Sequence, residues 1–467
     1  MANVTRSSDA GASVQDQIDQ FRSRYPSLET ITAMFADLNG VMRGKVLPVS
    51  SFDKVMTDGI LLPASVFGTD ATGESVPETG LVWESGDADF PWRTIPETLH
   101  ILPGSEGKNA AVMIQMMGHD VNADPHPIDP RGALERVLTR LHDMGIFPVI
   151  APELEFYLIN PKLDAGGMGQ IAATALTGQA QPMGQVYGLD AYDEFAPVID
   201  DIKSACADVA VGADAAISEY GKGQFEINLM HRNDGLRAAD EAVMLRRITR
   251  IVARHHGHDV TFMGKPFSDD TGSGFHLHAS LLNADGQNIM AEDKGQPPES
   301  HKNLQYAAAG MGAYLDQSMA VFAPNANAWR RIQPGHYAPI DRSWGHNNRT
   351  VSFRIPQGDA KSRRLEHRCA SADANPYLTI ALILAAMAEG IDQQLTPPPI
   401  TTGNAYDQPD RDGLPHSWGE AIARFADSAF AQKWLGADLV RVYAATKNYE
   451  RLQFESRVTP TEWTWYR

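Results

Sequence analysis

The amino-acid sequence predicts an α+β protein with two domains, a smaller strand-rich domain followed by a larger one that mixes helices and strands. A chain of 467 residues is long enough for more than one domain. The first 125 residues hold several short strand-like segments separated by turn residues. Residues 130–159 then have the pattern of a capped amphipathic helix followed by a long strand.

Composition and charge are those of an ordinary globular protein, with 43% hydrophobic and 21% charged residues. Forty basic and 58 acidic side chains leave a formal net charge of −18. This charge disfavours nucleic-acid or anionic-membrane partners, since both need a positively charged surface. Cys206 and Cys369 are the only cysteines, so no disulfide framework is expected.

The sequence also favours a cytoplasmic protein. Residues 1–20 lack the apolar segment that a secretory signal requires. The longest apolar stretch, residues 378–388, is about half the length that a helix needs to cross a bilayer.

The strand-like segments of the first domain are residues 30–38, 44–50 and 111–118. Residues 59–103, rich in proline and glycine, are expected to form turns and loops. The expected organisation is a flexible N-terminus at 1–25, a first domain at 26–122 and a second domain at 123–467.

Two helices of the second domain carry clear start signals. Asp129 can cap a helix whose first turn holds Pro130, and Gly145 ends it. Its apolar face consists of Leu134, Val137, Leu138 and Leu141. A second, almost wholly apolar helix is expected over 376–389, after the capping residue Asn375.

Three predicted strands place polar groups on one face. Glu153 and Glu155 are two residues apart in the strand 147–159, so both side chains project the same way. In 275–281, alternation places His276, His278 and Ser280 together. In 350–356, Arg354 faces away from Val351, Phe353 and Ile355. Such strands are expected to line a catalytic funnel.

The chemistry-bearing residues are carboxylates, one imidazole and several arginines. The acidic and imidazole set suits two or three hard divalent cations such as Mg²⁺ or Mn²⁺; it comprises Glu153, Glu155, Glu219, Glu226, His276 and Glu366. The arginines can bind carboxylate and phosphate oxygens through paired hydrogen bonds; they are Arg331, Arg349, Arg354, Arg364 and Arg368. Metal and arginine around a phosphoryl group indicate ATP-dependent chemistry.

In this order, the motifs resemble the glutamine synthetase family over residues 30–467. They are PELEFY (152–157), SEYGKGQFEIN (218–228), GSGFHLHAS (272–280), RRIQPG (330–335), NRTVSFRIP (348–356), RRLEHR (363–368) and DANPYL (373–378). The resemblance implies a small β-grasp-like N-terminal domain and a catalytic domain with an open barrel-like antiparallel sheet flanked by helices. It also implies a homo-dodecamer of two hexameric rings, with active sites shared between subunits.

The resemblance further implies roles for individual residues, with ATP as co-substrate. One metal would be bound by Glu155, Glu219 and Glu226, and a second by Glu153, His276 and Glu366. Glutamate would contact Glu155, Gly272, Arg331 and Arg368. ATP would contact His278, Ser280, Lys361 and Arg364. Catalytic roles near the transferred phosphate would fall to Arg349, Arg354 and Glu366.

The sequence departs from ammonia-using members of the family at three positions. Pro63 stands at the position of the aspartate that receives ammonium, and Tyr337 at that of the proton-accepting glutamate. Thr271 replaces an asparagine that helps to hold glutamate. Because activation of the carboxylate should survive while ammonium binding does not, we predict a larger amine acceptor. LPASVF and NNRTVSFRIP resemble the branch that ligates polyamines such as putrescine, through γ-glutamyl phosphate.

Several alternatives stay open at this stage. The acceptor could instead be a monoamine, ethanolamine or an aromatic amine, or the chain could be an ordinary glutamine synthetase with a rebuilt ammonium site. A non-catalytic member should have lost metal ligands, and none is missing. His336 is a hypothetical base for the amine. Phe67, Trp329, Tyr337 and Trp344 could surround the acceptor or simply pack.

Two further features have ordinary interpretations. The run HHGH at 255–258 is interpreted as a solvated cluster rather than a metal site. Tyr406 is interpreted as a loop tyrosine.

Overall fold

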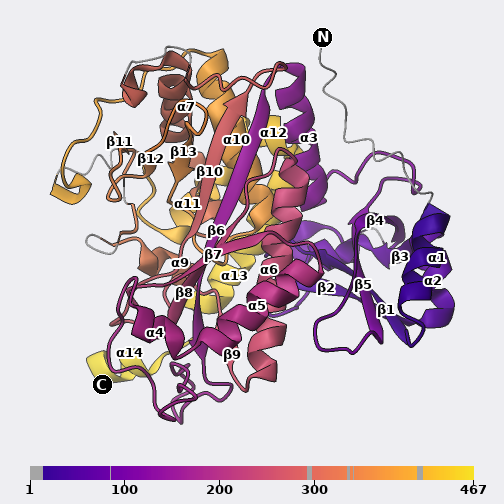
Figure 1. Cartoon of the computed structure of the whole chain (residues 1–467). Coiled ribbons are helices and arrows are strands. Elements are labelled where there is room, and N and C mark those ends of the chain that lie inside the picture. Colours follow the sequence, from indigo (N-terminus) through magenta and orange to yellow (C-terminus); the bar gives the residue numbers. More distant parts are fainter. Residues whose placement is uncertain (1–13, 85, 292–296, 334–336, 340, 408–413) are drawn as a thin grey trace.

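A five-stranded sheet and a larger, curled sheet form the framework of the protein in a computed structural model (Figure 1). The structure describes residues 14–84, 86–291, 297–333, 337–339, 341–407 and 414–467. The fold class predicted from the sequence is confirmed.

The smaller sheet has the order β2-β1-β5-β4-β3. Its strands are β1 (Thr30–Ala36), β2 (Met42–Pro48), β3 (Ile60–Pro63), β4 (Asp89–Ile101) and β5 (Asn109–Met116). β1 and β5 are parallel and the other pairs are antiparallel. Phe35, Phe67 and Trp92 pack together in its core, with ring centroids 4.4 to 5.6 Å apart.

Two sequence-based expectations for this region were wrong. The segment 59–103 contains β3 and the long strand β4, whose prolines obscure the alternation of a strand. The expected flexible terminus at 1–25 includes the helix α1 (Val14–Arg24), which buries Ile18 against the sheet's core. Helix α2 (Phe52–Asp58) packs beside α1, where Phe21 stacks on Phe52.

The larger sheet has the order β11-β12-β13-β10-β6-β8-β7, with β9 also paired to β6. The strands are β6 (Phe147–Ile159), β7 (Ala213–Ser218), β8 (Gln224–Leu229), β9 (Asp259–Thr261), β10 (Phe275–Leu282), β11 (Trp344–His346), β12 (Phe353–Ile355) and β13 (Leu365–His367). All pairs are antiparallel except β11 with β12. Since β12 covers only Phe353–Ile355, the strand predicted at 350–356 is shorter than expected.

Helices pack beside this sheet and against one another (Figure 1). They are α3 (Pro130–Asp143), α4 (Leu189–Asp193), α5 (Ala196–Asp208), α6 (Gly235–His255), α7 (Lys302–Ala313), α8 (Leu315–Phe322), α9 (Ala326–Arg331), α10 (Pro376–Asp392), α11 (Trp418–Ala426), α12 (Ala429–Leu435), α13 (Ala437–Glu455) and α14 (Pro460–Tyr466). The apolar helix α10 is central, since it contacts α3, α6, α7 and α12. No helix among the described residues is long and apolar enough to span a membrane.

The predicted helix caps are present. Asp129 Oδ1 accepts a hydrogen bond from the backbone N–H of Gly132 at 2.7 Å, and Gly145 follows α3 with a φ of +74°. Asn375 Oδ1 accepts from the N–H of Leu378 at 3.2 Å. Each cap satisfies a helix N–H that has no partner inside the helix.

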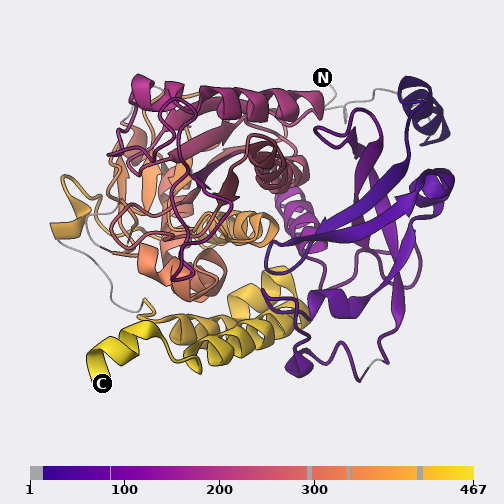
Figure 2. The ribbon, with the colours of Figure 1, turned by 90° about the horizontal axis from the view of Figure 1, so that it is seen from below.

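Hydrogen bonds and ion pairs connect the N-terminal sheet with the helices α10 and α13. Asn375 Nδ2 donates to the carbonyl of Asp37 at 2.8 Å, so one amide both caps α10 and holds the end of β1. From α13, one of the yellow helices along the lower edge of Figure 2, Glu450 Oε1 accepts from the N–H of Ala71 at 2.8 Å. Lys447 contacts both Asn39 and Glu450. These contacts orient the N-terminal sheet relative to the larger one.

We predict that Asn375→Ala lowers the free energy of unfolding by about 2 kcal/mol, because it removes a cap and also the hydrogen bond to the Asp37 carbonyl, which keeps only its bond from the Gly40 N–H. Urea unfolding followed by circular dichroism measures this loss. The matched control is Ser417→Ala, which removes only the cap of α11, where the Ser417 hydroxyl accepts from Glu420 N–H. It should cost about 1 kcal/mol. Equal losses in the two variants would contradict the double role of Asn375.

Candidate functional site

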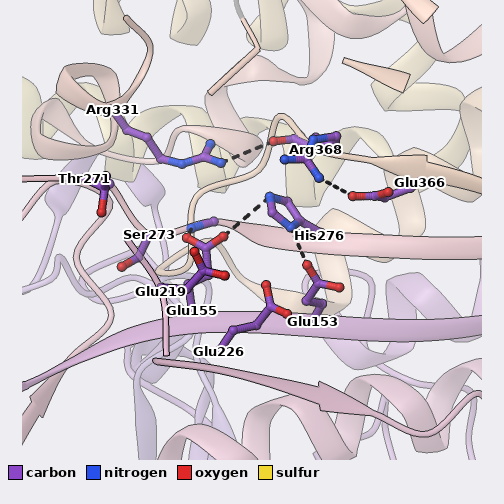
Figure 3. A network of polar contacts seen from close by, with 12 residues as sticks. Glu153, Glu155, Glu219, Glu226, Thr271, Ser273, His276, Arg331, Glu366 and Arg368 are labelled. Carbon is purple, nitrogen blue, oxygen red and sulfur yellow. Dashed lines mark hydrogen bonds and ion pairs between the residues drawn. The ribbon is translucent and has the colours of Figure 1, made fainter. Parts of the chain in front are cut away.

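Strand register places the acidic and imidazole residues in a row across the larger sheet. Glu155 lies opposite Glu226 across β6 and β8, and Glu153 lies opposite His276 across β6 and β10. On the other side of β10, His278 lies opposite Glu366. Glu366 in turn lies opposite Arg354 on β12. Residues more than 200 positions apart in sequence therefore share one polar face (Figure 3).

The members of this row contact each other directly. His276 Nδ1 lies 2.7 Å from Glu153 Oε1, and His278 Nε2 lies 3.3 Å from Glu153 Oε2. Asn228, on the same face of β8, donates from Nδ2 to Glu153 at 2.8 Å and to Glu226 at 3.1 Å. The sequence analysis missed Asn228, although it lies two residues after Glu226 in a strand.

Burial and mutual repulsion perturb the acids strongly. Burial, followed by the charge of Glu155, raises the pKa of Glu219 to about 8. Burial and the charge of Glu153 raise the pKa of Glu226 well above its usual value. Burial also acts to raise the pKa of Glu153, but hydrogen bonds from His276 and His278 outweigh it and lower that pKa.

These donors fit divalent cations. Two groups have ligand atoms within 4.8 Å of one another, Glu153 with Glu226 and His276, and Glu153 with His278 and Glu366. Nε2 of His276 is buried and has no hydrogen-bond partner among the described residues. An unsatisfied imidazole nitrogen among crowded carboxylates is an arrangement that a cation would complete. The grouping differs from the ligand sets implied by the family resemblance, because His276 lies with Glu226 and His278 joins Glu366.

Arginines surround the other end of the row. Glu366 is buried between Arg354, at 2.7 Å, and Arg368. Burial opposes ionisation of Glu366, but the charge of Arg368 together with those of His278 and His276 outweighs it and lowers the pKa of Glu366 to about 2. The Nε atoms of Arg354 and Arg368 are buried and have no hydrogen-bond acceptor among the described residues. Buried donors of this kind suit an anionic ligand.

A cavity of about 140 Å³ opens beside the row. Nine predicted site residues line it: Glu153, Glu155, Glu219, Glu226, Gly272, His276, Arg331, Arg349 and Arg368. Thr271 and Tyr337, noted as departures from the family, line it too. Arg331 ends α9, is buried, and donates to the carbonyls of Arg368 and Cys369, both at 3.3 Å.

The cavity also contains four residues that the sequence analysis missed: Val186, Tyr187, Tyr220 and Gln224. Tyr220 and Gln224 lie inside the motif SEYGKGQFEIN, so their neighbours in sequence pointed to them. Gln224 Nε2 donates to the Gly272 carbonyl at 3.0 Å, and its Oε1 accepts from the Thr271 hydroxyl. Val186 and Tyr187 come from a long loop with no motif, and only the tertiary fold brings them here.

The residues expected to contact ATP continue the same polar face beyond the cavity. Arg364 Nε donates to His278 Nδ1 at 3.2 Å. Ser280 Oγ donates to the carbonyl of Arg363 at 2.9 Å, which fixes the segment before β13 to β10. Lys361 is exposed on that segment.

Three of the four aromatic residues that could surround the acceptor instead pack or form hydrogen bonds away from the cavity. Phe67 is buried in the N-terminal core. Trp329 Nε1 donates to the Ala323 carbonyl at 3.0 Å, and the buried Trp344 Nε1 donates to that of Pro398 at 2.8 Å. Of the four aromatics, Tyr337 lines the cavity. Aromatic residues close in sequence to a site motif often pack in the core, because large apolar side chains are usually buried.

The remaining predicted positions lie elsewhere. Pro63 is in β3, paired with Asp89, and is not among the described residues that line the cavity. His336 lies outside the described residues. In the run 255–258, His256 is 2.7 Å from Asp201 at the surface. Tyr406 is in a short loop helix, where burial raises its pKa to about 12.

Comparison with known proteins identifies the family. A model of the glutamine synthetase catalytic domain matches residues 127–466. The chain belongs to the glutamine synthetase family. The family predicted from the sequence motifs is thus confirmed.

Individual relatives of this glutamine synthetase family member span nearly its whole length. It is 39% identical to γ-glutamylputrescine synthetase PuuA of Escherichia coli (strain K12), over 97% of this chain and 95% of the relative. It is 30% identical to glutamate–isopropylamine ligase of a Pseudomonas species, over 93% and 94% of the two chains. Among solved structures, the GmaS/ADP complex is similar with a TM-score of 0.81 and 28% identity, covering 95% of this chain and 97% of the other.

We predict that Mn²⁺ or Mg²⁺ stabilises the protein, because a cation that binds only the folded state adds about 2.7 kcal/mol at 100 times its dissociation constant. Thermal unfolding with and without the ion measures the shift. His276→Ala should reduce this shift substantially, whereas His255→Ala, at an exposed position at the end of α6, should preserve it. An unchanged shift in His276→Ala would remove His276 from the cation site.

Proposed function

We propose that this glutamate–amine ligase joins the γ-carboxylate of glutamate to a primary amine of putrescine or another polyamine, using ATP. The observation that carries the proposal is a contrast within one site. The acidic row is complete, while the two family positions that handle ammonium hold Pro63 and Tyr337. The similarity to γ-glutamylputrescine synthetase supports the same acceptor class.

The acidic row would hold two or three Mg²⁺ or Mn²⁺ ions. Following the family resemblance, we assign Glu155, Glu219 and Glu226 to one ion and Glu153, His276 and Glu366 to another. The geometry differs in that His276 lies with Glu226, and His278 lies with Glu366. When bound, these ions supply positive charge that offsets the repulsion between phosphate and carboxylate oxygens. The raised pKa values of Glu219 and Glu226 support this assignment, because a nearby cation would favour their ionised forms.

Glutamate would be held by the buried arginines Arg331 and Arg368, whose planar groups bind two carboxylate oxygens at once. Gly272 would let the substrate approach the backbone closely. A Cβ at Gly272 would lie 2.6 Å from the Gly264 carbonyl oxygen and 2.7 Å from Arg331 Cγ, so no larger residue fits without displacing Arg331.

The nucleotide would extend along the adjoining face, contacting His278, Ser280, Lys361 and Arg364. Arg349 and Arg354 would approach the transferred γ-phosphate, with Glu366 fixing Arg354 through their 2.7 Å ion pair. Because the phosphoryl group carries negative charge throughout its transfer, fixed guanidinium groups favour the transition state.

The reaction would have two steps. The γ-carboxylate oxygen attacks the γ-phosphorus of ATP, and ADP leaves. The amine nitrogen then attacks the acyl carbon of γ-glutamyl phosphate, inorganic phosphate leaves, and an amide remains. An alkylammonium has a pKa near 10.4, like lysine, so it must lose a proton before attack. His336 stays a hypothesis for the base.

The active sites would be shared between subunits of a dodecamer. Pro63 supports this arrangement, since β3 lies in the N-terminal sheet and Pro63 does not border the cavity among the described residues of its own chain. A residue at this position would therefore act on the cavity of a neighbouring subunit.

The test is phosphate release from ATP, glutamate and Mg²⁺ with ammonium, putrescine, spermidine, butylamine, isopropylamine, ethanolamine or aniline. We expect the highest kcat/KM with putrescine or spermidine. Preference for a monoamine, ethanolamine or aniline would support the second candidate function, a ligase for those amines. Preference for ammonium would indicate an ordinary glutamine synthetase.

A double substitution tests the account of specificity. Pro63→Asp with Tyr337→Glu restores two carboxylates and should lower kcat/KM for putrescine at least about tenfold, the effect of about 1.4 kcal/mol of binding energy. The ratio of ammonium to putrescine turnover should rise. Asp89→Asn, on the strand next to Pro63, is the control and should change neither value. An unchanged ratio in the double variant would show that acceptor choice is determined elsewhere.

A further inference from the structure

Three tyrosines from distant segments meet at the cavity. Tyr187 comes from the loop before α4, Tyr220 follows β7, and Tyr337 precedes β11. Their exposed fractions are 59%, 48% and 42%, which is high for large aromatic side chains. The rings of Tyr220 and Tyr337 stack, with centroids 5.5 Å apart and planes 19° from parallel.

We propose that the ring faces of Tyr220 and Tyr337 bind the alkyl chain and the second ammonium group of a diamine acceptor. This inference rests on the proposed function and deepens it, because it identifies the residues that distinguish a diamine from a monoamine of equal length. A tyrosine ring attracts a cation to its face through its quadrupole and offers an apolar surface to methylene groups.

The stacking geometry determines where the acceptor binds. A methylene chain between two rings needs about 7 Å, twice an ordinary carbon–carbon contact distance. At 5.5 Å, Tyr220 and Tyr337 are too close to hold a chain between them. The acceptor therefore lies over the solvent-exposed faces and edges of the pair, along one wall of the cavity.

Charge places the second ammonium group beside Tyr220 and Tyr337 rather than Tyr187. Arg349 Nη2 donates to the Tyr187 hydroxyl at 3.4 Å, so a guanidinium occupies that side. No arginine hydrogen bond to the Tyr220 or Tyr337 side chain is found among the described residues. An ammonium group is repelled by Arg349, so the side of the cavity next to Tyr187 is unfavourable for it.

The backbone of Tyr337 supports a functional role for its side chain. Its φ is +51°, in the left-handed region that bulky residues seldom adopt. Asparagine or glycine would occupy this conformation with less strain. Tyr187, with a φ of +58°, shares this conformation, and strained backbone of this kind clusters at functional sites.

The experiment compares kcat and KM for putrescine, butylamine and ammonium in the wild type and in four variants. Tyr220→Leu keeps apolar volume but removes the aromatic face, and Tyr337→Asn suits the positive φ. Tyr220→Phe and Tyr337→Phe are the matched controls, since they keep the rings and remove only the hydroxyls. Thermal unfolding verifies that each variant is folded.

We expect Tyr220→Leu and Tyr337→Asn to raise KM for putrescine up to about fivefold while kcat at saturating amine stays within about twofold, in line with a cation–π contact at a partly exposed site. In both variants the preference for putrescine over butylamine should fall, because butylamine lacks the second charge. The Phe variants should retain that preference.

Two results would overturn the inference alone. One is a wild-type preference for putrescine that survives in Tyr220→Leu and Tyr337→Asn. The other is an equal loss in the Phe variants, which would assign recognition to the hydroxyl groups. A wild type that prefers ammonium to putrescine would instead refute the proposed function, and the inference with it.

Discussion

The register of β6 with its two neighbours is the constraint on which the site depends. Because β8 and β10 both run antiparallel to β6, Glu153 and Glu155 each gain a polar partner directly opposite, His276 and Glu226. A slip of one residue would turn every one of these groups toward the apolar side of the sheet. The apolar residues between them, such as Leu154, Phe275 and Leu277, are fully buried and prevent that slip.

This arrangement concentrates like charges, and the rest of the site is arranged to offset them. Arginines flank the acids at one end, and the imidazoles of His276 and His278 lie between them. Glu219 and Glu226, which form no ion pair with an arginine among the described residues, have raised pKa values. The protein thus holds a charge distribution that is incomplete without positively charged ligands.

The sequence predicted those parts of the site that depend on local periodicity. Alternation in 147–159 and 275–281 correctly placed the side chains of both strands, and capping residues located α3 and α10. The strand β4 was missed because Pro91 and Pro96 interrupt its pattern, although proline is tolerated where its missing N–H has no partner in the sheet. Helix α1 was missed because its buried face is narrow.

What sequence reasoning could not supply was the meeting of distant segments. Tyr187 and Arg349 are 162 positions apart and contact each other in the folded chain, yet neither local sequence indicates the other. Similarly, Trp344 lies near the motif NRTVSFRIP, but its indole N–H donates a hydrogen bond to the Pro398 carbonyl. Whether a side chain lies in the site or in the core depends on how all side chains pack together. A short sequence pattern does not predict this.

The position of Glu153 has a consequence for cooperativity. One of its oxygens lies against His276 and the other against His278, so a single carboxylate belongs to both groups of potential ligands. Any ligand that reorients or neutralises Glu153 in one group of residues changes the affinity of the other group for its own ligand. Thermodynamic linkage requires this effect to be equal in both directions. The two halves of the site therefore act as one coupled unit.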